Sequence, residues 1–335
     1  MNFGYREVCL EHDTGPRHPE SPDRLRAIRR GLADRHDVKY VAASDADEDL
    51  VRAVHDPDYV DAVKAFCEDG GGNWDADTVA VEATWDATLA SAGLAEWAAR
   101  RALDGDDGRE TPFSLGRPPG HHAVEDDAMG FCFVNNAVVA AEAARREGTD
   151  RVAIVDWDVH HGNGTQDICY ERGDVFYASV HEDGLYPGTG EVAEAGAGEG
   201  AMGTLNVPYP PGSDTVDYLA AVDEVIAPAI RAFDPDLVLV SAGFDAHEHD
   251  PISRMRVSTE GYGLLAGRVR DLAADCGAGL AFVLEGGYGL DTLSKSVGTV
   301  HEVFDGYAPA EPDGEVSEGA REVLDALRDQ GFGSK

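Results

Sequence analysis

The sequence predicts an α/β protein built on a mainly parallel sheet, and three observations support this fold class. Apolar runs of strand length lack polar alternation, helical patterns alternate with these runs, and polar residues gather where the runs end. The chain has 335 residues and shows no internal repeat or linker. We therefore expect one domain over residues 1–335, with a core at about 10–305 and a C-terminal surface segment at 306–335.

Four segments have the composition of buried parallel strands. Each carries a continuous apolar run, as expected for a strand that is covered by helices on both faces. These segments span residues 151–159, 175–181, 236–244 and 279–287, and a shorter strand is expected at 112–118.

Helical patterns fill the intervals and carry recognisable ends. Residues 21–35 begin with Ser21 as the expected N-cap and Pro22 at the first helical position. Gly277 is a suitable C-cap for the pattern at 259–277. Two further helices are expected at 133–147 and at 213–233, the second capped by Ser213 or Asp214.

The charge balance is strongly acidic, because 27 basic residues face 64 acidic ones for a net charge of −37. An acidic tail, disorder or a cationic partner could each produce such an excess. The acids are instead spread between apolar segments, and we interpret them as an adaptation to high salt, where charges are screened within about 3 Å. No basic stripe is present, so direct binding to nucleic acid is not expected.

Cysteine usage and the N-terminus bear on the compartment. The five cysteines form no C-x-x-C motif and read as buried thiols of a reducing environment. The N-terminus lacks a basic region followed by an apolar one, and no apolar run reaches 18 residues. These features predict a soluble, cytoplasmic protein that makes no membrane contact.

The end of the first strong strand carries candidate metal ligands. Residues two apart on a strand share a face, so Asp156, Asp158 and His160 are expected to point the same way. Asp158, His160 and Asp245, which follows another strand, could hold one ion and leave a position open, as catalytic zinc sites do. The donor set suits Zn²⁺, and Fe²⁺ or Co²⁺ would also fit. The alternative is that these acids cap helices or face solvent.

A second cluster is the motif "RPPGHHA" at residues 117–123. Its adjacent histidines, His121 and His122, cannot share a helix or strand face, so they are not expected to chelate one metal together. They could act as two acid–base groups, each held by its own partner, or serve a structural role in the loop.

Six motifs together resemble the histone deacetylase family, including bacterial and archaeal relatives that act in acetoin pathways or on acetylated polyamines. The motifs occur in family order along nearly the whole chain. They are "RPPGHHA", "GFCFVNN", "DWDVHHGNGT", "YPGTG", "SAGFDAH" and "EGGY". The resemblance implies the arginase–deacetylase fold, with a mainly parallel eight-stranded sheet sandwiched by helices.

The resemblance also implies roles for the clustered residues. Asp158, His160 and Asp245 become the zinc ligands. His122 becomes the general base, and His121 becomes its neighbour, positioned by Asp156. Asn163 stands where class II-like members carry asparagine. If Asn163 contacts His122, a neutral amide stabilises the imidazolium less than a carboxylate does, which favours the neutral base.

Substrate contacts follow from the same resemblance. Tyr288 becomes the hydroxyl that bonds the substrate carbonyl, and Phe131 and Tyr186 become walls of a channel for the acyl-lysine stem. Gly130 and Gly287 are assigned to the same substrate-binding region.

A structural monovalent cation site, occupied by K⁺, is implied as well. Its ligands are Asp156, Ser179 and the backbone carbonyls of Asp158, His160 and Val180.

The implied function is a zinc-dependent deacetylase acting on acetylated lysine in proteins or on related small N-acetyl amines. An acetylpolyamine amidohydrolase is an alternative with the same chemistry. An arginase-like dimanganese ureohydrolase would need further ligands, and its D-x-H-x-D pattern is absent from the sequence. A non-catalytic acyl-lysine binder is the remaining alternative. The acyl group, the protein target and the oligomeric state stay open.

Overall fold

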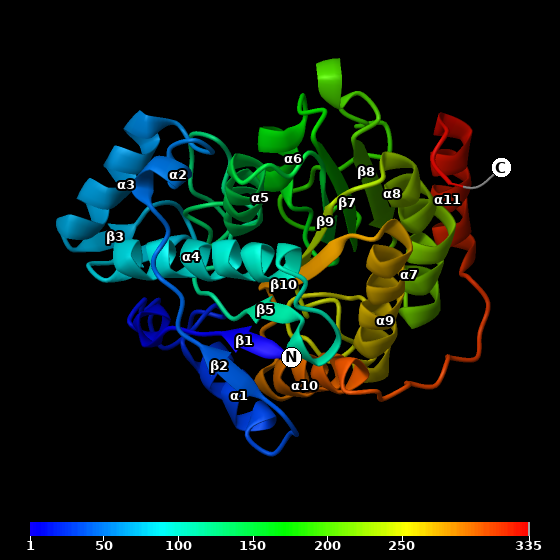
Figure 1. The fold of residues 1–335 in the computed structure, drawn as a ribbon, viewed down its shortest axis with the longest axis horizontal. Helices are drawn as coiled ribbons and strands as arrows, with labels where there is room; N and C mark the ends of the chain where they lie inside the picture. The colour runs from blue at the N-terminus through cyan, green and yellow to red at the C-terminus, as the bar shows by residue number, and fades with distance from the viewer. Residues whose placement is uncertain (334–335) are drawn as a thin grey trace.

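Eight strands form one sheet in the computed structural model, which describes residues 1–333 (Figure 1). Every neighbouring pair in this sheet is parallel. In order across the sheet, the strands are β2 (Lys39–Val41), β1 (Asn2–Gly4), β5 (Pro112–Ser114), β10 (Gly279–Leu284), β9 (Leu237–Ala242), β6 (Val152–Asp156), β7 (Val175–Glu182) and β8 (Thr204–Tyr209). The α/β class with an eight-stranded parallel sheet is therefore confirmed.

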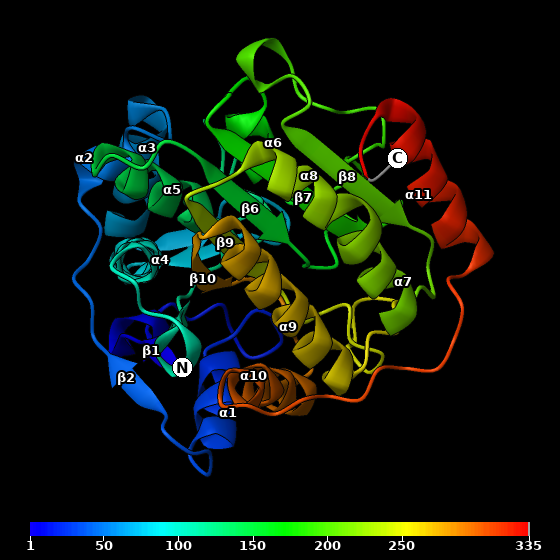
Figure 2. The ribbon, with the colours of Figure 1, turned by 45° about the vertical axis from the view of Figure 1, so that its right-hand side comes forward.

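Helices cover both faces of the sheet (Figures 1 and 2). A small antiparallel pair, β3 (Gly71–Asn73) with β4 (Val79–Val81), lies outside the main sheet. The helices are α1 (Asp23–Leu32), α2 (Glu48–Val51), α3 (Pro57–Glu68), α4 (Thr84–Leu103), α5 (Asn136–Arg146), α6 (Asn163–Cys169), α7 (Thr215–Ala221), α8 (Ala227–Phe233), α9 (Thr259–Cys276), α10 (Leu290–Phe304) and α11 (Glu318–Gln330). In the part of the chain described, none of these helices has the length and apolarity needed to cross a membrane.

The central strands contribute side chains to two hydrophobic cores, one on each face of the sheet. Ala153 and Val155 of β6 pack into the core shared with α1 and with α7 to α11. Val152 and Ile154 of the same strand pack into the core shared with α3, α4 and α5. This alternation explains the unbroken apolar runs of the sequence, because both faces of each central strand are buried.

The central strands end earlier than their apolar runs suggest. β6 stops at Asp156, β9 at Ala242 and β10 at Leu284, so the polar residues that follow lie in loops. The expectation that Asp158 and His160 continue a strand is therefore wrong. Carboxylates explain the early end: the amides of Asp158 and His160 donate to Asp156 Oδ1 and Asp158 Oδ1 instead of to a neighbouring strand.

Three strands of the main sheet had no counterpart in the sequence patterns, and neither did the small pair β3 and β4. β1 and β2 contain only three residues each, which is too short to show a period. β8 carries Pro208, which is tolerated because β8 is the last strand of the sheet.

Helix ends agree with the sequence in part. Asp214 caps α7 by accepting the amides of Val216 and Asp217, and Gly277 closes α9 with φ of 67°. Ser21 does not cap α1, which begins at Asp23 with no side-chain cap. The helix expected over 213–233 is interrupted by a π-turn at Val222–Ile226, since the following Pro228 has no N–H to bond the carbonyl four residues earlier.

Both ends of the described chain join the main body. β1 places residues 2–4 within the sheet, ahead of the core range expected to begin near residue 10. In α11, Ala320, Leu324 and Leu327 are fully buried in the core that also contains α9 and α10. One face of this C-terminal helix is thus part of the core, although its other face is exposed.

Candidate active site

Three candidate ligands meet where neighbouring strands β6 and β9 end. Asp158 and His160 lie in the loop after β6, and Asp245 lies in the loop after β9. One ligand atom from each residue lies within 4.8 Å of the other two, and all three side chains are buried. Among residues 1–333, no other group of three or more such side chains comes together in this way. The sequence-based grouping of these residues is confirmed, even though loops rather than a strand bring them together.

The hydrogen bonds in this cluster leave one carboxylate oxygen unused. His160 Nδ1 lies 3.0 Å from Asp158 Oδ1 and 3.3 Å from Asp245 Oδ2. The outer oxygens are occupied: Asp158 Oδ2 accepts the amide of Gly286 at 2.8 Å, and Asp245 Oδ1 accepts the amide of Val159 at 2.8 Å. Asp245 Oδ2 is buried and accepts no hydrogen bond. Apart from its contact with His160, this buried oxygen is free to take a cation as its partner.

Glycines allow the backbone to approach the carboxylates closely. A Cβ atom at Gly286 would overlap both Asp245 Oδ2 and Asp158 Oδ2. A Cβ atom at Gly243 would overlap Asp158 Oδ2. Only glycine fits at these two positions without displacing the candidate ligands.

Burial and charge in the cluster also favour a cation. Burial raises the pKa of Asp245 to about 7, and the adjacent Asp158 carboxylate adds to the shift. Burial alone would lower the pKa of His160, but the carboxylates of Asp158 and Asp245 outweigh it and raise that pKa to about 10. One imidazole and two carboxylates make a donor set suited to a divalent ion with an open position, so the residues fit the implied metal.

The two adjacent histidines have separate partners, as the sequence suggested. His121 Nδ1 lies 3.0 Å from Asp156 Oδ2, and His122 Nδ1 lies 2.8 Å from Asn163 Oδ1. Burial opposes a charge on His121, but the carboxylates of Asp158 and Asp156 raise its pKa to about 10. Burial, followed by the charge of His121, holds the pKa of His122 well below its usual range. His122 is therefore the member of the pair that stays neutral.

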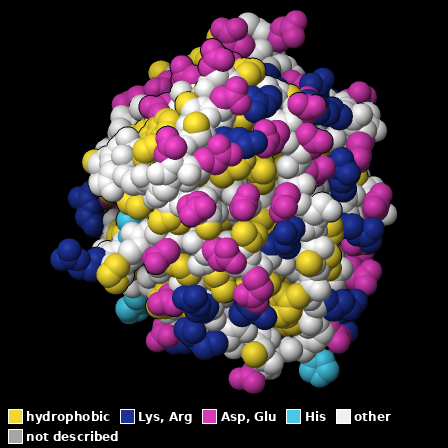
Figure 3. Space-filling view, turned by 90° about the vertical axis from the view of Figure 1, so that its left-hand side faces the viewer, with side chains coloured by type: hydrophobic (Ala, Val, Ile, Leu, Met, Phe, Trp, Pro, Cys, Tyr) yellow, Lys and Arg dark blue, Asp and Glu magenta, His cyan; other side chains and the backbone are white. Residues whose placement is uncertain are grey.

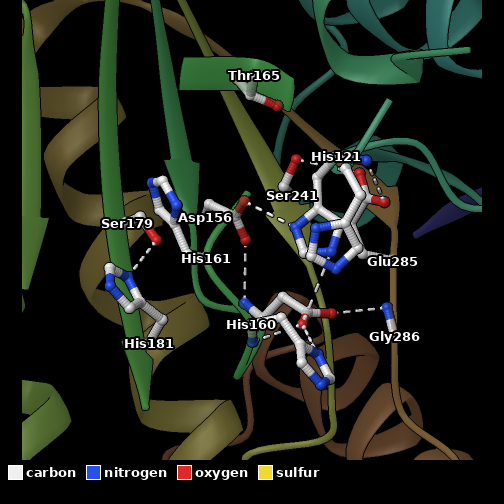
Figure 4. Close-up of polar contacts among 12 residues, drawn as sticks. His121, Asp156, His160, His161, Thr165, Ser179, His181, Ser241, Glu285 and Gly286 are labelled. Atoms are coloured by element: carbon white, nitrogen blue, oxygen red, sulfur yellow. Dashed lines mark hydrogen bonds and ion pairs between the residues drawn. The ribbon is translucent and has the colours of Figure 1, made fainter. Parts of the chain in front are cut away.

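Two further residues hold the histidine pair, and the sequence patterns predicted a role for neither. The Tyr177 hydroxyl donates to Asp156 Oδ2 at 3.1 Å. Glu285 is fully buried and accepts the amides of Gly120 at 2.8 Å and His121 at 3.2 Å, while its other oxygen accepts the Ser241 hydroxyl at 3.1 Å (Figure 4). The available sequence signal was a glutamate at the end of the apolar run "GLAFVLEGG".

Aromatic rings lie near the candidate ligands and His122. The Tyr186 ring lies edge-on to His122 with centroids 5.1 Å apart, and its side chain is 37% exposed. The rings of Phe131 and Tyr288 meet at 84° with centroids 6.0 Å apart. Gly130 packs so closely on His122 that a Cβ atom there would overlap the imidazole ring. Gly287, with φ of 114°, sets the turn into Tyr288.

Ser179 and His161 lie on the β7 side of the cluster (Figure 4). Ser179 pairs in register with Asp156 across β6 and β7, and its Oγ lies 2.9 Å from His181 Nδ1. The K⁺ site expected from Asp156, Ser179 and the backbone carbonyls of Asp158, His160 and Val180 stays a prediction. His161 Nδ1 lies 2.8 Å from Thr189 Oγ1, and its Nε2 lies 3.0 Å from Gln166 Oε1, so it bonds away from the ligand cluster.

Comparison with known proteins gives matches over most of the chain. Residues 18–304 match the family model described as "Histone deacetylase domain". The chain is 39% identical over 311 residues to the histone deacetylase-like amidohydrolase of Pseudomonas aeruginosa, covering 85% of this chain and 81% of that protein. It is 38% identical over 317 residues to a probable deacetylase of Methanothermobacter thermautotrophicus, with 93% of each chain covered. The crystal structure of the HDA15 HD domain matches with a TM-score of 0.90 at 36% identity, covering 98% of this chain and 93% of that one.

Proposed function

This chain belongs to the histone deacetylase family of amidohydrolases, and we propose that it removes acetyl groups from acyl-lysine in proteins or from related small N-acetyl amines. The observation that carries the proposal is Asp245 Oδ2, which has no hydrogen-bond donor and faces His160 and Asp158 in a buried cluster. This cluster lies beside His122, whose pKa is held well below its usual range by burial. Amide hydrolysis needs an activated water, a base and a donor for the oxyanion, and the cluster has a candidate for each.

Asp158, His160 and Asp245 would hold the divalent ion, with Zn²⁺ as the proposed metal and Fe²⁺ or Co²⁺ compatible with the same donors. When bound, such an ion supplies Lewis-acid activation of water and of the amide carbonyl. The amides of Gly286 and Val159 fix the outer carboxylate oxygens and so orient the ligands.

His122 is proposed as the general base. In its neutral form Nδ1–H donates to Asn163 Oδ1, which leaves the lone pair of Nε2 free to accept a proton. The same nitrogen can return the proton to the leaving amine. His121, ion-paired with Asp156, would stay protonated. Its charge disfavours a second charge on His122, so His122 is neutral before the reaction and able to accept a proton during it.

Tyr288 is proposed as the donor to the substrate oxyanion. Burial raises the pKa of its phenol well above the usual value, so the hydroxyl keeps its proton. A preorganised donor of this kind is worth about 3 kcal/mol in the transition state. Phe131 and Tyr186 would enclose the neutral alkyl stem of an acylated amine, with Gly130 and Gly287 at the base of the same channel.

An acetylpolyamine is the second candidate substrate. Asp77 and Asp75 lie close enough to Tyr186 that, after burial, their carboxylates raise the pKa of its phenol further. Acidic side chains beside the aromatic wall would attract the free ammonium groups of an acetylated polyamine.

The test is an assay of purified protein in high KCl on acetyl-lysine peptides and acetylated polyamines, with and without a chelator. We expect chelation to abolish turnover, and we expect His122→Ala and Tyr288→Phe each to lower it strongly. His36→Ala serves as the control, since the His36 side chain is 90% exposed. Turnover that survives chelation, or that survives loss of both His122 and Tyr288, would overturn the mechanism. Binding without any turnover would favour an acyl-lysine binder instead.

A further inference from the structure

Asp250 is a buried carboxylate in the loop between β9 and α9, and it contacts the segment that carries Tyr288. Its Oδ2 accepts the amide of Tyr288 at 2.7 Å and the amide of Gly289 at 3.0 Å. Its Oδ1 accepts the amide of Ile252 at 3.1 Å within its own loop. The residue is 8% exposed, and within residues 1–333 no basic side chain forms a salt bridge with it. Three backbone amides therefore take the place of a cationic partner.

Arg24 holds the same turn from the opposite side. Its Nε donates to the carbonyl of Gly287 at 2.7 Å, and its Nη2 donates to the carbonyl of Glu285. Its guanidinium lies 5.1 Å from the centroid of the Tyr288 ring. The peptide unit that joins Gly287 to Tyr288 is thus bonded at its carbonyl by Arg24 and at its amide by Asp250.

This turn contains flexible residues, so its position depends on such contacts. Gly286, Gly287 and Gly289 surround Tyr288, and Gly287 adopts φ of 114°, which other residues rarely reach. The Tyr288 phenol oxygen lies at the end of a long side chain, so a tilt of the backbone by about 10° moves this oxygen by about 1 Å. A misplacement of about 1 Å can cost about 100-fold in rate.

We infer that Asp250 is a positioning residue for Tyr288, which rests on the proposed role of Tyr288 as the oxyanion donor. The carboxylate fixes the direction in which the phenol leaves the backbone, and it ties this direction to the loop that also carries Asp245. The competing interpretation is that Asp250 stabilises only its own loop, through Ile252, and affects catalysis no more than a carboxylate acceptor far from the site does.

A matched variant separates these interpretations. Asp236 Oδ2 also accepts two backbone amides, those of Asp150 and Arg151, at 3.0 Å each. Asp236 lies at the start of β9, whereas Asp250 and the candidate site follow the end of that strand. Asp236→Ala therefore removes a similar pair of bonds, made by an exposed side chain, at the opposite end of the sheet.

The experiment compares Asp250→Ala, Asp250→Asn, Asp236→Ala and wild type on one acetyl-lysine peptide. We expect Asp250→Ala to lower kcat about 10-fold or more with little change in KM, because the oxyanion contact strengthens in the transition state. Asp250→Asn keeps an acceptor oxygen and should retain an intermediate kcat. Asp236→Ala should keep the wild-type kcat. Equal kcat for Asp250→Ala and wild type would overturn the inference.

A double-mutant cycle with Tyr288→Phe tests whether the effect passes through the phenol. If Asp250 acts by positioning Tyr288, Asp250→Ala should cost little more once the hydroxyl is gone. A full, multiplicative loss in the Tyr288→Phe background would show that Asp250 acts elsewhere.

Hydrogen exchange gives a readout that needs no turnover. The amides of Tyr288 and Gly289 should exchange faster in Asp250→Ala than in wild type and Asp236→Ala. Unchanged exchange of the Tyr288 and Gly289 amides would overturn the positioning role of Asp250 even if activity fell. If wild type hydrolyses no acetylated amine while Asp250 protects these amides from exchange, the proposed function fails. The hydrogen bonds by which Asp250 holds the Tyr288 backbone would still be supported.

Discussion

Asn163 Oδ1 lies 2.8 Å from His122 Nδ1, so the proposed base is paired with a neutral amide and not with a carboxylate. The neighbouring His121 is paired with the Asp156 carboxylate at 3.0 Å. Two adjacent imidazoles, with ring centroids 4.1 Å apart, therefore have opposite tendencies to carry charge.

The partner of His122 should set the acid limb of the pH profile. Asn163→Asp places a carboxylate against Nδ1, which stabilises the imidazolium and raises the pKa of His122. More alkaline solution is then needed to reach the neutral base, so the acid limb of kcat/KM should move upward by about 1 pH unit or more. The measurement is kcat/KM against pH, with Asn73→Asp on the exposed strand β3 as control. If the acid limb does not move, Asn163 does not control the pKa of the general base.

Gly286 should be required for metal binding. In Gly286→Ala, the new Cβ would overlap the Asp158 and Asp245 carboxylates, so we expect loss of bound metal and of activity. The measurement is metal content after dialysis against Zn²⁺, together with the rise in Tm on adding the ion. Gly267→Ala is the control: the nearest atom to its Cβ is Val303 Cγ1 at 3.9 Å, and alanine in this helix should be neutral or stabilise by up to about 1 kcal/mol. Full metal occupancy in Gly286→Ala would contradict the ligand geometry.

His55 should make stability fall in mild acid. Its Nδ1 lies 2.8 Å from the Val124 carbonyl and must carry the proton, while its Nε2 accepts the amide of Asn135 at 2.9 Å. Burial lowers its folded pKa from 6.5 to about 4, so the unfolded chain binds more protons between these values. This histidine therefore contributes stability above pH 6.5 that is lost as the pH falls toward 4, with a slope of up to about 1.4 kcal/mol per pH unit.

The check on His55 is urea unfolding across this pH window. His55→Gln should flatten the decline in unfolding free energy, because the titrating group is gone. His36→Gln, at a side chain that is 90% exposed, should leave the slope as it is in wild type. The same slope in His55→Gln and wild type would assign the acid sensitivity to other groups.

Salt should stabilise the protein. Figure 3 shows acidic side chains distributed over one whole face with basic ones among them, and not gathered into one patch. With a net charge of −37, repulsion opposes the folded state at low ionic strength and is screened within about 3 Å near 1 M salt. We expect the unfolding free energy in urea to rise between 0.1 and 2 M KCl. Equal stability at both concentrations would argue against adaptation to high salt.

Local patterns in the sequence were sufficient for the central part of the fold. The apolar runs identified β6, β7, β9 and β10, because a strand buried on both faces has apolar residues at consecutive positions. The three-residue strands β1 and β2 leave no such record. They form because the edge of the neighbouring strand offers unpaired backbone groups, and this edge exists only in the folded sheet.

The sequence by itself grouped Asp158, His160 and Asp245, which lie within four residues after a buried strand, whereas the adjacent pair His121 and His122 joined this group through the family resemblance. Parallel strands bring their carboxyl ends together, so this grouping follows from topology. Only the tertiary structure decided which groups hold these residues in place. Glu285 bonds Gly120 across 165 positions of the chain, and Asp250 bonds Tyr288 across 38. A buried carboxylate takes whichever amides the packed loops bring to it, and separations of this kind leave no periodic signal in a sequence.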